Sequence, residues 1–182
     1  MGTIINAIDV DELKQMQARL KSDHAVGNKQ PTVVATWVGG GSTEVVMGDR
    51  KMTIGGPGNL NAVGAVLGSL GACDIDVILM HAALQGLVIE AIRIEVSGKF
   101  NTAGFYGAAD EGSGYEQIES KIFIKAPGAT ADQIAYLQEQ CEHHSPVGDS
   151  LARAVSSKLT IQMETADKNK TDSFDEAKIT AS

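Results

Sequence analysis

The hydrophobic and polar positions in the first third of the chain predict a helical arm followed by a small sheet. Asp9 and Glu12 form a capping pair ahead of apolar residues at helical spacing, so a short helix is expected in the arm. The polar stretch 24–31 is expected to be a linker. Runs of β-branched or alternating apolar residues, separated by glycine turns, then predict strands at 32–37, 44–47 and 51–54.

A long apolar helix is the central feature of the chain. It is expected over 60–87, directly after the glycine-rich turn 55–59. The helix contains Gly64, Gly68 and Gly71. A glycine inside a helix costs up to ~1 kcal/mol relative to alanine. These glycines therefore indicate that a sheet or a partner subunit packs closely against the helix.

The hydrophobic period changes after this helix. Residues 92–96 alternate between apolar and polar side chains, as a half-buried strand does. The remaining elements expected are an edge strand near Phe105, a strand at 118–125, a helix from Thr130 to about His143, a helix capped by Ser145 with Pro146 at its start, and a final strand carrying Leu159, Ile161 and Met163. Because strands and helices occur in clusters, the expected fold class is α+β.

This order divides the chain into three expected parts. They are an N-terminal helical arm at 1–30, one domain at 31–163, and a polar tail at 164–182 that we expect to be disordered. The formal net charge of the 182 residues is −8. An acidic surface repels phosphate, so we expect no nucleic-acid partner.

No signal peptide and no membrane span are expected. The first residues lack a basic region followed by a long apolar region. The most apolar run, 62–73, is followed at once by Asp74 and Asp76, and it is too short to cross the hydrocarbon of a bilayer. The two cysteines are too few for a secreted disulfide framework. These features predict a soluble cytoplasmic protein.

The common cofactor and metal motifs do not occur in the sequence. The glycine run 55–58 is not followed by the lysine of a phosphate-binding loop, and no G-x-G-x-x-G is present. There is no H-E-x-x-H, no C-x-x-C and no G-x-S-x-G. We therefore expect no cofactor and no metal.

Cys73 is the candidate reactive group. It lies in the middle of the predicted long helix, and two interpretations stay open: a small buried apolar residue, or a reactive thiol. A reactive thiolate needs a nearby cation or a helix N-terminus, whereas Asp74 and Asp76 would repel it. Positive charge must then come from elsewhere in the fold. The candidates are Arg50, Arg153, His143 and His144.

Three separated stretches of the chain occur together, in the same order, in a known family. The first is 67–78 (LGSLGACDIDVI), with Gln85-Gly86 and the strand 92–98 (IRIEVSG) after it. The second is 143–151 (HHSPVGDSL), and the third, earlier in the chain, is 35–40 (ATWVGG). In this arrangement the sequence resembles the osmotically inducible protein C / organic hydroperoxide resistance (OsmC/Ohr) family from about Thr32 to Met163.

The resemblance implies a fold and an activity. The fold would be α+β, with antiparallel sheets around a long central helix, in an intertwined homodimer with active sites at the interface. Cys73 would be the peroxidatic cysteine, which attacks the O–O bond of an organic hydroperoxide and becomes a sulfenic acid. In the family a second cysteine condenses with the sulfenic acid, and a dithiol reductant reopens the disulfide.

The sequence departs from the family pattern at the site. Ser145 stands where the second cysteine would be, and a hydroxyl cannot form a disulfide. The family's glutamate would fall near 62–64, where none is present, and Gly41 and Ser42 stand where its arginine often lies. Arg50 is the nearest candidate to stabilise the thiolate.

Cys141 is the other cysteine, and it precedes Ser145 by one helical turn. It is either a displaced resolving residue or a buried structural one. Its spacing with Ile134 and Leu137 places it on the apolar face of the predicted helix, which favours burial.

Three hypotheses for function follow from these residues. The first is a hydroperoxide reductase that uses Cys73 and an external thiol reductant. The second is a non-catalytic dimer of the same fold that binds a small apolar or acidic ligand in its interface pocket. The third is an interaction protein that uses the N-terminal helix and the polar tail as contact surfaces.

Overall fold

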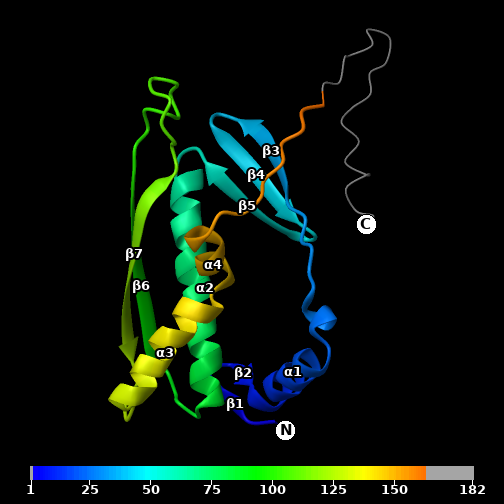
Figure 1. Ribbon diagram of the computed structural model, residues 1–182, viewed down its shortest axis with the longest axis vertical. Helices are drawn as coiled ribbons and strands as arrows, with labels where there is room; N and C mark the ends of the chain where they lie inside the picture. The colour runs from blue at the N-terminus through cyan, green and yellow to red at the C-terminus, as the bar shows by residue number, and fades with distance from the viewer. Residues whose placement is uncertain (1, 163–182) are drawn as a thin grey trace.

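The computed structural model describes residues 2–162 (Figure 1), and the predicted tail at 164–182 lies outside them. The chain forms, in order, β1 (Ile4–Ile5), β2 (Ile8–Asp9), α1 (Val10–Ser22), a 3-10 turn η1 (His24–Gly27), β3 (Val34–Gly39), β4 (Ser42–Met47), β5 (Arg50–Gly55), α2 (Ala62–Leu84), β6 (Ala91–Phe100), β7 (Tyr115–Lys125), α3 (Ala131–His144) and α4 (Pro146–Ala152). The strands pair antiparallel as β1-β2, β3-β4-β5 and β6-β7. The α+β prediction is confirmed.

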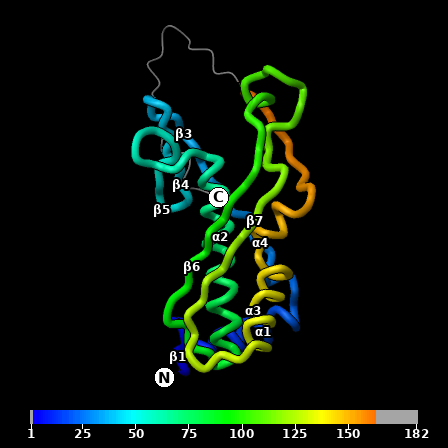
Figure 2. Tube along the Cα trace, turned by 90° about the vertical axis from the view of Figure 1, so that its left-hand side faces the viewer, coloured from blue at the N-terminus to red at the C-terminus, as the bar shows by residue number. Residues whose placement is uncertain are grey.

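The long helix α2 is the axis of the molecule. Figure 2 shows β6 and β7 running along it, and in Figure 1 α3 and α4 lie against it. The β3-β4-β5 sheet stands near its N-terminal end, and β1 and β2 lie near its C-terminal end (Figure 1). Of the three glycines in α2, Gly71 is the one that meets the sheet, because a Cβ there would approach Val96 Cγ2 to 3.3 Å. The predicted close packing is therefore confirmed at Gly71.

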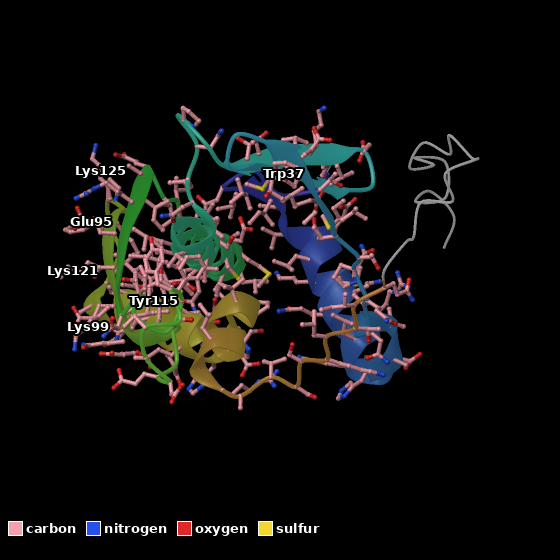
Figure 3. The ribbon with its side chains drawn as sticks, turned by 90° about the horizontal axis from the view of Figure 1, so that it is seen from above. Trp37, Glu95, Lys99, Tyr115, Lys121 and Lys125 are labelled. Atoms are coloured by element: carbon pink, nitrogen blue, oxygen red, sulfur yellow. The ribbon has the colours of Figure 1, made fainter. Side chains whose placement is uncertain are left out.

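The buried core lies between the C-terminal half of α2, the helix α3 and the inner face of β6-β7. Its members are Val77, Ile78, Ala82, Leu87, Leu137 and Cys141, with isoleucines 89, 92, 94, 122 and 124 packed against them. The register pairs Ile92 with Ile124 and Ile94 with Ile122, so the same face of both strands is apolar. The opposite face carries charged side chains, including Glu95, Lys99, Lys121 and Lys125 (Figure 3).

The helix caps agree closely with the sequence. The Asp9 carboxylate accepts hydrogen bonds from the backbone N–H groups of Asp11 and Glu12, both at 3.0 Å. Thr130 and Gln133 form a capping box at the start of α3. Ser145 caps α4, and Pro146 opens it. Each cap depends on residues within three positions of one another, which explains why the sequence predicts it.

The N-terminal arm is tied to the central helix by Asn6, which sequence analysis missed. Asn6 and Ala7 have φ values of 52° and 62°, and they make the two-residue turn between β1 and β2. The Asn6 amide donates to the backbone oxygen of Leu87 at 3.0 Å, and its side-chain oxygen accepts from the Ile89 N–H at 2.9 Å. The arm predicted at 1–30 is therefore anchored where α2 ends.

Two predicted strands are wrong. Residues 101–114 form turns, with Ala108 N–H bonded to the oxygen of Ala103, and Phe105 is exposed. Residues 153–162 form no strand, and both Leu159 and Ile161 are exposed, whereas Met163 lies outside the described residues. A strand needs a neighbouring edge as well as an alternating pattern, and none lies beside these segments within residues 2–162.

Candidate functional site

Cys73 lies in the middle of α2, where the start of α4 meets it. The sulfur is half-buried, and the Ser145 hydroxyl lies 3.4 Å from it in a hydrogen bond. Ser145 itself is only 3% exposed. The structure thus brings together two predicted site residues that are 72 positions apart in the chain.

The backbone around Ser145 fixes the position of its hydroxyl. Its N–H donates to the oxygen of Cys141 at 3.3 Å, which ends α3, and its Oγ accepts from the N–H of Gly148 at 3.2 Å, which starts α4. A Cβ at position 148 would lie 3.1 Å from Ser145 Oγ and 3.7 Å from Leu70, so glycine lets α4 approach α2 closely. The hydroxyl therefore belongs to the junction of three helices.

Asp74 is a buried carboxyl group beside this junction, only 6% exposed. Burial raises the pKa of Asp74, and a hydrogen bond with the Ser145 side chain offsets part of that increase. The sequence suggested only that Asp74 would repel a thiolate. It gave no sign that the carboxyl is buried, because aspartate is rarely found inside.

Cys141 occupies the predicted buried position. Its thiol donates to the backbone oxygen of Asp74 at 3.7 Å. Burial, together with Asp74, Cys73 and Glu142, raises the pKa of Cys141 to about 12. A thiol with this pKa stays protonated at neutral pH, so Cys141 is not a nucleophile in this state.

The four candidate cations lie in different places. Arg50 is exposed at the start of β5, and Arg153 pairs with Asp149 at 2.8 Å. His144 stacks on His81 with 5.6 Å between ring centroids, and His143 packs edge-on against His144. Within residues 2–162 no hydrogen bond joins any of the four to the Cys73 sulfur.

A buried histidine that the sequence analysis did not single out lies further along α2. His81 Nδ1 is 3.0 Å from the Tyr136 hydroxyl, and the ring is 8% exposed. Burial and then His144 lower the pKa of His81. Asp74, Ile78 and His81 recur at spacings of four and three, which places them on the face of α2 that meets α3. No group of three possible metal ligands occurs in the part of the chain that the structure describes.

Two adjoining clefts lie beside the site. One, of about 760 Å³, is bounded by α2, α3 and β7, and Asp74, Cys141 and Ser145 line it. The other, of about 720 Å³, lies beside the N-terminal half of α2, α4 and the start of β7. Leu70, Ser120 and Gly148 line both. Cys73 is absent from the lining of both clefts, although its hydrogen-bond partner Ser145 lines the first.

The fold and these residues define an OsmC-like protein. Residues 55–160 match the family model of OsmC-like proteins, which covers more than half of the chain, and the chain belongs to that family. This confirms the resemblance found in the sequence. No protein of curated function matches the chain.

Solved structures agree on the fold. An OsmC-like protein from Mycoplasma pneumoniae matches with a TM-score of 0.60 and 18% identity, over 69% of this chain and 89% of that one. A hypothetical protein from Aquifex aeolicus matches with a TM-score of 0.57 and 16% identity, over the same shares. An OsmC-like protein of unknown function from Vibrio cholerae has a TM-score of 0.51 and 12% identity, over 68% and 94%. At these identities the likeness concerns the fold alone.

By length and composition, α2 could span a membrane. Core helices of soluble proteins share these properties, and α2 is the central helix of this fold. Only 28% of the most apolar 18-residue stretch of α2 is buried by the described residues, so much of this apolar helix is exposed among them.

Proposed function

We propose that this protein reduces organic hydroperoxides, with Cys73 as the reacting thiol. The observation that carries the proposal is the Ser145 hydroxyl hydrogen-bonded to the Cys73 sulfur at 3.4 Å. Ser145 stands where the resemblance places the second cysteine, so this contact supports a site in which a hydroxyl replaces that thiol. Membership of the OsmC-like family supports the same activity.

The chemistry follows from the two side chains. Cys73 attacks the O–O bond of the hydroperoxide, which gives a Cys73 sulfenic acid and an alcohol. An external thiol then condenses with the sulfenic acid and releases water, and a second thiol displaces Cys73 from the mixed disulfide. The hydroxyl of Ser145 and the high pKa of Cys141 both favour an external thiol over an internal one. Because both cysteines are free, we place the activity in the reducing cytoplasm.

A homodimer would complete the site. The uncovered surface of α2 includes Val66, which is 38% exposed, and the β3-β4-β5 sheet exposes Trp37, Val38 and Met52. Such apolar surface is typical of protein interfaces. We propose that a second copy covers it, and that Arg50, exposed on the same sheet, supplies the positive charge for the Cys73 thiolate.

The activity is tested by turnover of cumene hydroperoxide with dithiothreitol as reductant. We expect the wild type and Cys141→Ser to consume the peroxide and Cys73→Ser to be inactive. Cys141→Ser is the matched control, because it removes the other thiol of the chain. Absence of turnover in the wild type, or equal turnover in Cys73→Ser, would contradict the proposal.

The two clefts favour a second candidate function, the binding of a small apolar ligand without catalysis. About half of the residues that line each cleft are aliphatic, and Leu70, Ser120 and Gly148 line both. This function predicts saturable binding of an apolar fluorescent probe that is unchanged in Cys73→Ser and weakened in Leu70→Asn. Probe binding in a protein that does not consume hydroperoxide would favour this candidate over the first.

A further inference from the structure

We propose that the larger cleft beside α2 binds an apolar amine, with the ammonium group at the Asp74 carboxyl group and the alkyl chain against the isoleucines of β7. The inference goes beyond hydroperoxide reduction, because it requires no reaction at Cys73. It rests on the second candidate function in one respect, that the clefts take up an apolar molecule.

The larger cleft, of about 760 Å³, has an apolar lining on both the strand side and the helix side. Ile122 and Ile124 are alternate residues of β7, so their side chains point to the same face of the strand. From the helices, Ile78 and Leu137 contribute buried side chains, and Ile134 is 39% exposed. Volumes of this size are typical of sites for small ligands. An alkyl chain in contact with this lining gains free energy because it leaves water.

The charged residues that line the two clefts are all acidic. Asp74 and Glu142 line the larger cleft, and Glu116 lines the smaller one. Among the described residues, no lysine, arginine or histidine lines either cleft. Glu116 pairs with Lys99 at 3.0 Å, whereas Asp74 and Glu142 form no ion pair within residues 2–162. The charge of the larger cleft therefore favours a cationic ligand over an anionic one.

Asp74 is the buried member of this acidic pair. It is 6% exposed, whereas Glu142 is exposed and accepts a hydrogen bond from the Gln138 amide at 2.9 Å. Burial raises the pKa of Asp74 because it penalises the carboxylate, and an ammonium group beside it would favour the ionised form again. A hydrogen bond between two charged groups is roughly twice as strong as one between neutral groups. Asp74 is therefore the position where an ammonium head group gains most.

The smaller cleft, of about 720 Å³, provides surface for the far end of a longer chain. It adjoins the larger cleft at Leu70, Ser120 and Gly148, which line both. Val66 and Leu151 line the smaller cleft and are 38% and 41% exposed. An alkyl chain that passes Leu70 would cover part of this exposed apolar surface. The ligand class is therefore an amine on a long aliphatic chain, not a small polar amine.

The test is isothermal titration calorimetry of the full chain with decylamine, decanol and decanoate. The three probes share one alkyl chain and differ only in the head group. At about pH 7.5 an alkyl amine is protonated, as the lysine side chain is with its ordinary pKa of about 10.4, and a carboxylic acid is ionised. In the wild type we expect decylamine to bind at least ~10-fold more tightly than decanol, and decanoate to bind more weakly than decanol.

Two variants of equal net charge separate contact at Asp74 from general attraction to an acidic protein. Asp74→Asn should reduce the preference for decylamine over decanol to below ~3-fold. Asp76→Asn removes an exposed carboxylate from the same helix and should keep the preference. Leu70→Asn should weaken the binding of all three probes alike, because Leu70 lines both clefts. Circular dichroism checks the fold of each variant, and the comparison of the three probes on the wild type needs no variant.

Each result supports or overturns the amine site. Equal affinities of decylamine and decanol for the wild type, or a preference that survives in Asp74→Asn, overturn it and leave the binding of an apolar ligand intact. A preference lost equally in Asp76→Asn also overturns it, because net charge then attracts the amine. If none of the three probes binds the wild type, both the amine site and the second candidate function are wrong. Hydroperoxide turnover is measured without these probes, so the first candidate function is tested separately.

Discussion

Two regions of this molecule differ in how much of their apolar surface is buried. Around the C-terminal half of α2, the helix α3 and the strands β6 and β7 bury Ile78 and Leu137 to 1% and 2% exposure. In α1 and the β3-β4-β5 sheet, by contrast, Val10 alone is buried, and Trp37 is 76% exposed. The β3-β4-β5 sheet also carries apolar side chains, including Trp37, Val38 and Met52, so for the sheet the difference lies in the availability of a partner surface. The first region is covered by other parts of the described chain, whereas the second exposes apolar side chains that we propose a second chain covers.

The largest effect is expected in the covered region. Ile78→Ala deletes a fully buried side chain between α2 and α3 and should lower the free energy of unfolding by about 2–5 kcal/mol. Urea denaturation measures this loss. Val66→Ala shortens an exposed apolar side chain on the same helix. It is the matched control and should change the free energy of unfolding of the isolated chain much less. A loss below ~1 kcal/mol at Ile78 would mean that the core is not packed as described.

The next effect is expected in the uncovered region. Trp37→Asp places a charge on the exposed sheet, and if a second copy covers this sheet the variant should sediment as one chain while the wild type sediments as two. Analytical ultracentrifugation distinguishes the two masses. Phe105→Asp changes an equally exposed aromatic residue in the 101–114 loop and serves as the control. A wild type that sediments as a single chain would remove the dimer from the proposed function.

The third effect concerns the connection between the arm and the helix. Asn6→Ala leaves the backbone oxygen of Leu87 and the N–H of Ile89 without their partner and should cost about 1–3 kcal/mol. Because these hydrogen bonds attach the arm to the end of α2, their loss should make limited proteolysis within residues 1–30 faster in the variant. Asn28→Ala changes an asparagine beyond η1 whose side chain makes none of these bonds and is the control. Equal cleavage rates in Asn6→Ala and the wild type would show that the anchor lies elsewhere.

The sequence predicts what is local and misses what is brought together by the fold. The caps at Asp9, Thr130 and Ser145 depend on neighbours within three residues, and all three are confirmed. The strand expected around Leu159 depends on a distant edge, which no alternation can supply. The turn at Asn6 was missed because Asn-Ala lacks the glycine that usually marks a tight hairpin.

The candidate site shows the same contrast between features that neighbouring residues determine and features that depend on the fold. The resemblance identified both Cys73 and Ser145 as candidate site residues, whereas the proline after Ser145 predicted only the helix cap. Their contact at 3.4 Å joins residues 72 positions apart, which no local pattern determines. Asp74 was interpreted only as a charge that would repel a thiolate, and its burial was not predicted because aspartate is rarely buried. Its burial follows from the packing of α3 and α4 on α2, which is known only from the structure.

The smallest effect is expected in the pH dependence of stability, and it separates two buried groups in the covered region. The folded-state pKa of Asp74 is raised above 3.8, so the native state binds more protons than the unfolded state between 3.8 and the folded value. Stability should therefore fall as the pH rises through that window. The pKa of His81 is lowered below 6.5, so the native state binds fewer protons just below 6.5, and stability should fall as the pH drops through that window.

Urea unfolding over a pH series tests both slopes. The free energy of unfolding of Asp74→Asn, relative to the wild type, should increase as the pH rises from 3.8. That of His81→Phe, relative to the wild type, should increase as the pH drops below 6.5. Asp76→Asn is the matched control for the change in net charge, because it removes an exposed carboxylate from the same helix. A stability difference between Asp74→Asn and the wild type that is constant with pH would show that the carboxyl group is solvated.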